Sequence, residues 1–212
     1  MVSLTRPNLV VMRREMVTVG RRMYDQGLIV AAEGNLSVRL GGHSFLVTPA
    51  GSRKGNLRVQ DLVEIDTQGR SPQGTATSEW PLHWQIYALR PDVRAICHAH
   101  SPWATAFAAA GRDLDGNLLT ETAAQLPRVP LAARSLPGTD ALAASIVPFI
   151  PDCDAVLLGN HGVVTVGADL MSAFNLLETV ERLAQVTLLA EAAAGISGVD
   201  PETLRKLQNP RR

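Results

Sequence analysis

The sequence predicts a mixed α/β fold of three layers, in which α-helices flank a central, mostly antiparallel β-sheet. Short strand-like runs follow one another across turn residues, and helical stretches with an apolar face alternate with them. No Gly-x-Gly-x-x-Gly motif follows a predicted strand and no Walker-type loop is present, which argues against a parallel, nucleotide-binding sheet. Because no Pro-, Gly- or Ser-rich linker divides the chain, we expect residues 1–212 to form a single domain.

The N-terminal part of the chain is predicted to form one long helix and three strands. Apolar residues recur at helical spacing for about 20 residues from Asn8, and this pattern ends near Gly27. Two short strands follow at 35–40 and 44–48, with a glycine pair in the turn between them, as in a hairpin. A third strand is expected at 62–66.

The rest of the chain is predicted to alternate helices with strands. A helix over 78–89, capped by Thr77 or Ser78, runs directly into a buried strand at 93–97. The further elements are a helix at 102–110, an extended segment at 127–133, a helix capped by Thr139 at 140–149, strands at 155–158 and 163–166, and a helix at 170–194. Gly159 and Gly162 are expected to allow a sharp backbone between the last two strands.

Composition argues against several classes of partner. Lys plus Arg and Asp plus Glu both total 20, so the formal charge is zero and no basic stripe indicates nucleic acid binding. No run approaches the ~20 apolar residues of a membrane span, and the N-terminus has no apolar stretch of the signal-peptide type. We therefore expect a cytoplasmic protein that binds neither nucleic acid nor membrane. Cys97 and Cys153 lie among apolar residues, which is typical of buried, reduced thiols.

Histidines at predicted strand ends are the strongest functional signal. His98 and His100 end the buried run 93–97, and side chains at i and i+2 of a strand point to the same side. Two imidazoles converging on one spot suit a divalent transition metal, although a polar strand end opening into a loop gives the same short pattern. His161 follows the apolar run 155–158, either at a strand end or in an ordinary hairpin turn. Three such histidines would leave a metal with an open position, as in a catalytic zinc site.

Glu79 is the carboxylate that we expect at this metal site. It lies in the first turn of helix 78–89, and antiparallel packing of that helix on the next strand would bring it close to His98 and His100. There it is predicted to be a fourth metal ligand in the absence of substrate, or a general base. The helix dipole alone also favours an acid at such a position. We interpret His83 as a packing or polar-face residue rather than a ligand.

Polar groups at the start of the same helix indicate an anion site. Thr77 and Ser78 offer hydroxyls and backbone N–H groups there, which is where a phosphate binds readily. Asn35 and Gly51 belong to glycine-containing turns that would supply further donors. Each of these stretches alone is also typical of an ordinary cap or turn.

Five motifs, taken in order, resemble the zinc-dependent class II aldolase family. This family includes L-fuculose-1-phosphate aldolases, L-ribulose-5-phosphate 4-epimerases, a dehydratase and decarboxylases. The resemblance covers nearly the whole chain, from about Met12 to Ala190. The motifs are Gly34-Asn35-Leu36-Ser37, Thr48-Pro49-Ala50-Gly51, Ser78-Glu79, His98-Ala99-His100 and Gly159-Asn160-His161-Gly162.

The resemblance implies a site and a reaction. It implies that His98, His100 and His161, with Glu79, hold Zn²⁺, although Co²⁺ or Mn²⁺ would suit the same donors. It also implies that Glu79 is the acid/base and that a substrate phosphate is bound by four residues: Asn35, Gly51, Thr77 and Ser78. The implied reaction is aldol cleavage of a ketose 1-phosphate, such as fuculose 1-phosphate, to dihydroxyacetone phosphate and an aldehyde through a metal-bound enediolate. The alternative is a decarboxylase, dehydratase or sugar-phosphate 4-epimerase on the same scaffold. The resemblance further implies a homotetramer with active sites at subunit interfaces.

Two departures from the family pattern concern this reaction. The aldolases use a tyrosine in the loop after the histidine strand as a proton donor, whereas Tyr24 and Tyr87 both precede that strand and the loop has 118–121 as Leu-Leu-Thr-Glu. Ala50 stands where the aldolases commonly have a hydroxyl residue before the glycine of the phosphate turn. The proton donor and the strength of phosphate binding are therefore the points at which this chain is expected to differ.

Overall fold

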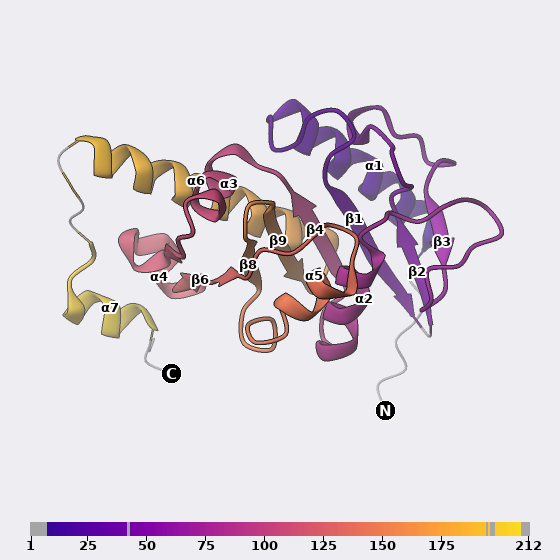
Figure 1. The fold of residues 1–212 in the computed structure, drawn as a ribbon. Helices are drawn as coiled ribbons and strands as arrows, with labels where there is room; N and C mark the ends of the chain where they lie inside the picture. Colours follow the sequence, from indigo (N-terminus) through magenta and orange to yellow (C-terminus); the bar gives the residue numbers. More distant parts are fainter. Residues whose placement is uncertain (1–7, 42, 194, 196–197, 209–212) are drawn as a thin grey trace.

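The computed structural model describes residues 8–41, 43–193, 195 and 198–208, and its main element is a seven-stranded sheet (Figure 1). The strands of this sheet are β1 (Asn35–Gly41), β2 (Ser44–Val47), β3 (Val63–Ile65), β4 (Ala95–Ala99), β7 (Leu131–Ala132), β8 (Ala155–Leu158) and β9 (Gly162–Gly167). Their order is β3-β2-β1-β4-β9-β8-β7, and every neighbouring pair is antiparallel except β7 and β8. The predicted fold class, a mostly antiparallel sheet flanked by helices, is confirmed.

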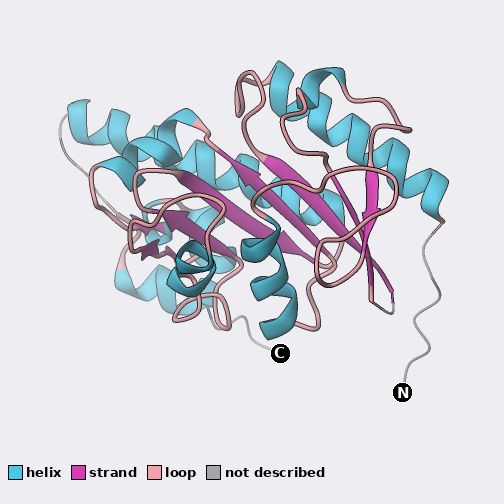
Figure 2. Ribbon diagram, turned by 45° about the vertical axis from the view of Figure 1, so that its right-hand side comes forward, coloured by secondary structure: helices cyan, strands magenta, loops and turns pink. Residues whose placement is uncertain are grey.

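Helices cover both faces of this sheet, as Figure 2 shows. The helices are α1 (Leu9–Asp25), α2 (Trp80–Leu89), α3 (Pro102–Ala109), α4 (Thr120–Gln125), α5 (Asp140–Ser145), α6 (Leu170–Ala193) and α7 (Pro201–Gln208), with 3-10 turns η1 (Lys54–Asn56) and η2 (Gly116–Leu118). Side chains from α1, α3 and α6 pack on one face, and those from α2 and α5 pack on the other. Among the described residues, no helix combines the length and the apolar character that crossing a membrane requires.

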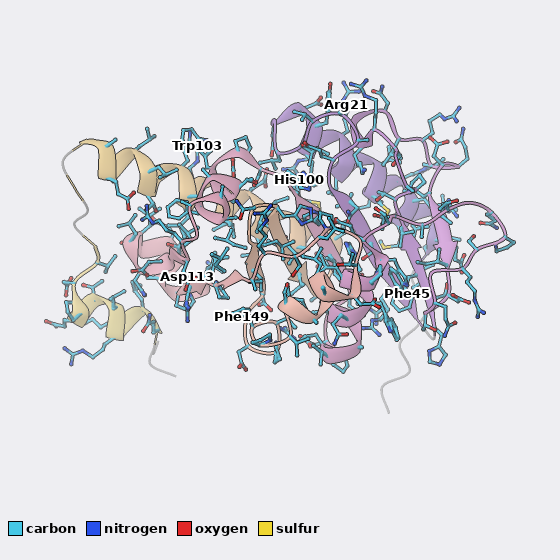
Figure 3. The ribbon with its side chains drawn as sticks, in the orientation of Figure 1. Arg21, Phe45, His100, Trp103, Asp113 and Phe149 are labelled. Atoms are coloured by element: carbon cyan, nitrogen blue, oxygen red, sulfur yellow. The ribbon has the colours of Figure 1, made fainter. Side chains whose placement is uncertain are left out.

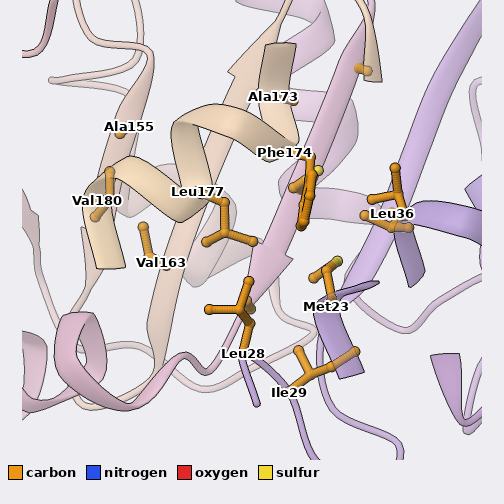
Figure 4. Close-up of a cluster of buried hydrophobic side chains, with 14 of the residues drawn as sticks. Met23, Leu28, Ile29, Leu36, Ala155, Val163, Ala173, Phe174, Leu177 and Val180 are labelled. Carbon is orange, nitrogen blue, oxygen red and sulfur yellow. The ribbon is translucent and has the colours of Figure 1, made fainter. Parts of the chain in front are cut away.

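The alternation of side chains along β4 divides the interior into two hydrophobic clusters. Ala95, Cys97 and Ala99 join the cluster beneath α1, α3 and α6, of which Figure 4 shows a part. Ile96 joins the cluster beneath α2 and α5. Because neighbouring residues of a strand point to opposite faces, His98 shares the α2 side with Ile96. The fold thus turns the first predicted metal ligand toward the helix that follows Glu79.

Several element boundaries differ from those predicted. The extended segment 127–133 is two short strands in different sheets, because β6 (Arg128–Val129) pairs with β5 (Leu114–Asp115) while β7 joins the main sheet. The helix predicted at 140–149 ends as α5 at Ser145, since Pro148 has no N–H to donate to the carbonyl oxygen of Ala144, four residues earlier. Of the predicted positions, Ala194 and the second hairpin glycine, Gly42, lie outside the described residues.

Two helices lack a strong sequence signal. The helices α4 and α7 contact each other at the end of the molecule opposite β2 and β3 (Figure 1). Helix α7 buries none of its side chains, and α4 is only six residues long. Short helices with few buried residues leave little apolar periodicity to detect, which is why the sequence did not predict them.

Candidate active site at the histidine strand

Three histidines meet at one end of the sheet. His98 lies in β4, His100 follows that strand directly, and His161 lies in the turn between β8 and β9. Their potential ligand atoms all lie within 4.8 Å of one another, and the Nε2 atoms of His98 and His100 are 3.2 Å apart. Figure 3 marks His100 near the middle of the molecule. The antiparallel pairing of β4 with β9 places the turn that carries His161 beside the end of β4.

The turn around His161 depends on one left-handed residue and two close backbone approaches. Asn160 has φ +56°, and Asn is among the few side-chain-bearing residues that tolerate this conformation. Gly162 is needed for a different reason, since a Cβ there would lie 2.3 Å from the carbonyl oxygen of Ala99. Neither Gly159 nor Gly162 has a positive φ, so Asn160 makes the turn, while both glycines permit close approach of backbone: a Cβ at Gly159 would lie 2.9 Å from Arg134 N.

The donor set fits a divalent transition metal. The Nδ1 atom of His98 lies 2.9 Å from the carbonyl oxygen of Val163, which can only accept, so Nδ1 carries a hydrogen and Nε2 is left for a proton or a cation. His161 Nδ1 and Glu79 Oε1 are buried without a hydrogen-bond partner among the described residues. The side chain of His98 is 0% exposed and that of His161 7%, whereas that of His100 is 27% exposed. The cluster therefore has a closed side and an accessible side, as a site that admits a substrate requires.

Glu79 completes this cluster. Its Oε2 lies 3.0 Å from His98 Nε2 and its Oε1 lies 3.2 Å from His161 Nε2. The structure corrects the predicted location in one detail: Glu79 is the residue before α2, with φ −94° and ψ 17°, rather than part of the first helical turn. Its N–H is 3.3 Å from Thr77 Oγ1, which accepts it. The carboxylate thus reaches the histidines from the start of α2, as its predicted role requires.

Charge and burial act together on the ionisation of these groups. Burial by itself would raise the pKa of Glu79, but the charge and hydrogen bond of His98, followed by the charge of His161, hold that pKa well below its ordinary value. Burial and the charge of His98 lower the pKa of both His100 and His161 to about 4. At neutral pH the site therefore offers a carboxylate and two neutral imidazoles, which are the forms that bind a metal.

A cavity of about 240 Å³ opens beside the histidines, and the residues predicted to bind phosphate line it. Those residues are Asn35, Gly51, Thr77 and Ser78, and they share the cavity with Glu79, His100 and His161. Two hydrogen bonds join the two turns involved: Ala50 N–H donates to Thr75 O at 3.1 Å, and Thr77 N–H donates to Thr48 O at 3.2 Å. The structure thus brings the predicted metal and phosphate residues together, while phosphate binding itself stays a prediction.

Two residues at this cavity were missed by the sequence analysis. Lys54 is buried, and its Nζ donates to the carbonyl oxygens of Ala32 at 2.7 Å and Ser52 at 2.9 Å. Burial lowers the pKa of Lys54 to about 8. Glu33 places its Oε1 3.7 Å from His100 Nδ1. Position 54 holds one of the two lysines in the sequence, but only its location beneath two loops reveals that it ties them together.

His83 also has more polar contacts than the sequence predicted. Sequence analysis interpreted it as a packing or polar-face residue, and the structure buries it completely. Its Nε2 lies 2.5 Å from Asn35 Oδ1, and its Nδ1 lies 2.6 Å from Ser37 Oγ. The side-chain amide of Asn35 also donates to Glu79 Oε2 at 2.8 Å. His83 is therefore not at the metal cluster, but it contacts a residue that is bonded to the cluster.

The tyrosines do not reach the cavity. Tyr87 is buried and its hydroxyl lies 2.8 Å from Ser37 Oγ, while Tyr24 is on α1 and 38% exposed. The loop after β4 presents Glu121 on α4, which lines a different cavity beside Trp103. Among the described residues, no tyrosine therefore lines the cavity at the histidines.

Comparison with known proteins finds relatives over most of the chain. The sequence profile of the class II aldolase and adducin N-terminal domain matches residues 14–188. An L-fuculose phosphate aldolase of Methanocaldococcus jannaschii is 35% identical over 178 residues, which cover 84% of this chain and 96% of that protein. A 3-oxo-tetronate 4-phosphate decarboxylase of Haemophilus influenzae is 34% identical over 177 residues, covering 81% and 84%. A solved L-fuculose 1-phosphate aldolase superposes with a TM-score of 0.85 at 28% identity, covering 94% of this chain and 95% of the other.

Proposed function

The chain belongs to the class II aldolase family, and from this premise we propose that it is a zinc-dependent lyase that cleaves a ketose 1-phosphate to dihydroxyacetone phosphate and an aldehyde. Fuculose 1-phosphate is the first substrate to test, because a relative at 35% identity carries the name L-fuculose phosphate aldolase. The observation that supports this proposal most is the shared cavity, in which His100, His161 and Glu79 stand beside the four residues predicted to bind phosphate. A phosphorylated substrate held there would present its other end to the histidines.

His98, His100 and His161 would hold the zinc, with Glu79 as a further ligand in the absence of substrate. A bound divalent cation would supply the positive charge that stabilises negative charge developing on the substrate oxygens. Nitrogen and carboxylate donors suit Zn²⁺, and Co²⁺ or Mn²⁺ would occupy the same donor set.

We assign to Glu79 the transfer of the proton to and from the substrate carbon. In the condensation direction, the carboxylate removes a proton from the hydroxymethyl carbon of dihydroxyacetone phosphate, and that carbon then forms the new bond to the aldehyde carbon. Cleavage is the reverse: the C3–C4 bond breaks, C4 becomes the aldehyde carbon, and Glu79 returns the proton to C3. The depressed pKa of Glu79 keeps it in the carboxylate form that the first of these steps requires.

A second proton transfer, at the aldehyde oxygen, distinguishes the aldolase from the alternative function, a decarboxylase. In an aldol reaction the aldehyde oxygen also gains or loses a proton, and this chain has no tyrosine after β4 for that transfer. A decarboxylation makes no such demand, since the bond to the carboxylate breaks, carbon dioxide leaves, and only the remaining carbon takes up a proton. The relative named 3-oxo-tetronate 4-phosphate decarboxylase, at 34% identity, favours the same alternative.

Product analysis separates the two functions. Metal-loaded protein is incubated with fuculose 1-phosphate and, separately, with a 3-oxo-tetronate 4-phosphate, and both dihydroxyacetone phosphate and carbon dioxide are measured against chelator-treated protein. The proposal expects dihydroxyacetone phosphate, and it is wrong if none forms above the metal-free control. Carbon dioxide would establish the decarboxylase, a new ketone a dehydratase, and an inverted sugar without fragments an epimerase. Metal analysis of the purified protein tests the assignment of zinc.

A further inference from the structure

Five buried side chains form a continuous hydrogen-bonded chain that ends at Glu79. Tyr87 Oη lies 2.8 Å from Ser37 Oγ, which lies 2.6 Å from His83 Nδ1. His83 Nε2 lies 2.5 Å from Asn35 Oδ1, and Asn35 Nδ2 lies 2.8 Å from Glu79 Oε2. All five residues are buried. These hydrogen bonds therefore run through the interior from the last turn of α2 to the candidate active site.

Secondary structure brings these residues into one row. Glu79, His83 and Tyr87 are spaced four residues apart, so they lie on one face of α2 and of the turn that starts it. Asn35 and Ser37 are spaced two apart in β1, so they point to the same side of the sheet. The helix face and the strand face interlock, and the side chains alternate between α2 and β1 along the row.

The chemistry of the groups fixes the direction of every hydrogen bond. A carboxylate only accepts, so the NH₂ of Asn35 faces Glu79 and the carbonyl oxygen of Asn35 faces His83. That oxygen also only accepts, so His83 carries its hydrogen on Nε2 and accepts at Nδ1. Ser37 then donates to Nδ1 and accepts from the hydroxyl of Tyr87. Only one tautomer of His83 satisfies this arrangement.

We propose that His83 is a positioning residue for Glu79, acting through Asn35. The Nε2–H of His83 holds the Asn35 amide in the orientation that donates to Oε2 of Glu79, and Ser37 and Tyr87 hold the tautomer of His83. Asn35 occupies only Oε2, so Oε1 of Glu79 is left without a hydrogen bond, 3.2 Å from His161 Nε2. The inference rests on the proposed function, in which Glu79 moves the proton on carbon.

A purely structural role does not require these five hydrogen-bonded side chains. Five buried polar groups are costly unless every one is paired, and apolar side chains of similar size would fill the same space without that requirement. A role for His83 as a proton carrier is also unfavourable, because burial and then the charge of His98 lower the pKa of His83 to about 3. A ring that stays neutral can keep one tautomer across the working pH range, which is what orientation of Asn35 needs.

A double-mutant cycle on the metal-loaded protein tests the chain as a unit. His83→Phe keeps a ring of similar size but cannot donate to Asn35, and kcat is expected to fall about 10- to 100-fold with KM changed less than about threefold. Tyr87→Phe removes the outermost donor and is expected to lower kcat about two- to tenfold. In the double variant, Tyr87→Phe should add no further loss, because the chain is already broken at His83.

Two matched variants separate positioning from packing. His83→Gln retains an amide N–H that can donate to Asn35, so it is expected to recover part of the kcat that His83→Phe loses. Trp84→Phe changes an aromatic residue of the same helix that packs on Phe45, with ring centroids 6.0 Å apart, and should leave kcat unchanged. Additive losses in the double variant, or an equal loss in Trp84→Phe, would show that the residues act through packing alone.

The tautomer of His83 gives a readout that does not depend on activity. Imidazole ¹⁵N shifts of the zinc-loaded protein, assigned by the loss of one set of signals in His83→Gln, should show the Nε2–H tautomer at pH 8 and still at pH 5. An Nδ1–H tautomer, or an imidazolium, would overturn the proposed chain. If the protein releases no dihydroxyacetone phosphate but His83 has the Nε2–H tautomer, the proposed function is wrong while the proposed hydrogen-bond arrangement is confirmed.

Discussion

Buried polar side chains are used differently on the two faces of the sheet. On the α6 face they hydrogen-bond to backbone: the carboxylate of Glu181 accepts from the N–H groups of Trp103 and Ala104 at the start of α3, and Thr165 donates to Ala173 O. On the α2 face some also bond to backbone, as His98 does to Val163 O, but five of them form a row of side-chain hydrogen bonds that ends at Glu79. The bonds of Glu181 satisfy backbone N–H groups at the end of a helix, whereas the row of side-chain bonds orients a reactive group. The comparison assigns stability to the first face and reactivity to the second.

The largest expected effect comes from changing Glu79 on the α2 face. Glu79→Gln keeps the size and one carbonyl oxygen but removes the group that moves the proton, so kcat for dihydroxyacetone phosphate release should fall about 10²- to 10⁴-fold. The variant should still fold, because Gln keeps the size of the side chain and a carbonyl oxygen that can accept from Asn35, and circular dichroism checks this. Wild-type turnover in Glu79→Gln would contradict the proposal, because it would show that Glu79 does not move the proton.

A substitution on the α6 face should have the opposite pattern, lowering stability but leaving kcat nearly unchanged. Phe174 is fully buried in the cluster shown in Figure 4, and Phe174→Ala should lower the free energy of unfolding by about 3–5 kcal/mol. Its kcat, measured at a temperature where the variant is still folded, should stay within about threefold of the wild type. Urea unfolding and a progress curve on the same preparation check both statements. A large loss of kcat in the folded variant would show that the two faces are coupled.

How well each face follows from the sequence also differs. The apolar spacing in α1 predicts the face of the helix that is buried, and Met16, Val19 and Met23 on that face belong to the cluster beneath α1, α3 and α6. His98, His100 and His161 could be singled out because imidazoles at strand ends have few other uses. The location of Glu79 before α2 could not be predicted, because the choice of the first helical residue depends on Pro81 and on Thr77, whose side chain accepts the Glu79 N–H.

The hydrogen-bonded chain was beyond reach of the sequence for a different reason. The spacing of Glu79, His83 and Tyr87 by four residues is visible in the sequence, but it predicts only a shared helix face. The partners on β1, Asn35 and Ser37, are supplied by the packing of α2 on the sheet, which no local pattern specifies. Lys54 is similar, since the carbonyl groups that it joins belong to loops whose approach is a tertiary feature.

Because His83 lies on the α2 face, that face should make the free energy of unfolding depend on pH. Its pKa in the folded protein, about 3, lies below the ordinary value of 6.5, so the unfolded chain binds a proton first as the pH falls. Stability from this group is therefore present above pH 6.5 and is lost progressively toward pH 3, by about 2 kcal/mol between pH 7 and pH 5.

The measurement is urea unfolding of metal-free protein at several pH values. His83→Gln should show a shallower fall in the free energy of unfolding between pH 7 and pH 5 than the wild type. Phe174→Ala is the matched control, because it destabilises the other face and should keep the wild-type slope. Equal slopes in the wild type and His83→Gln would contradict a buried, neutral His83.

The smallest expected effect concerns the rim of the cavity, where the α2 face meets solvent. Ala50 is exposed, lines the cavity, and stands where the aldolases that this chain resembles commonly have a hydroxyl residue. Ala50→Ser adds one donor beside Gly51, so KM for a phosphorylated ketose should fall about two- to tenfold, the range of one hydrogen bond. Stability should change by less than about 0.5 kcal/mol, as for other surface substitutions. The same ketose without its phosphate is the control: a hydroxyl that contacts phosphate leaves its KM unchanged, and an equal fall for both compounds would place the phosphate away from this turn.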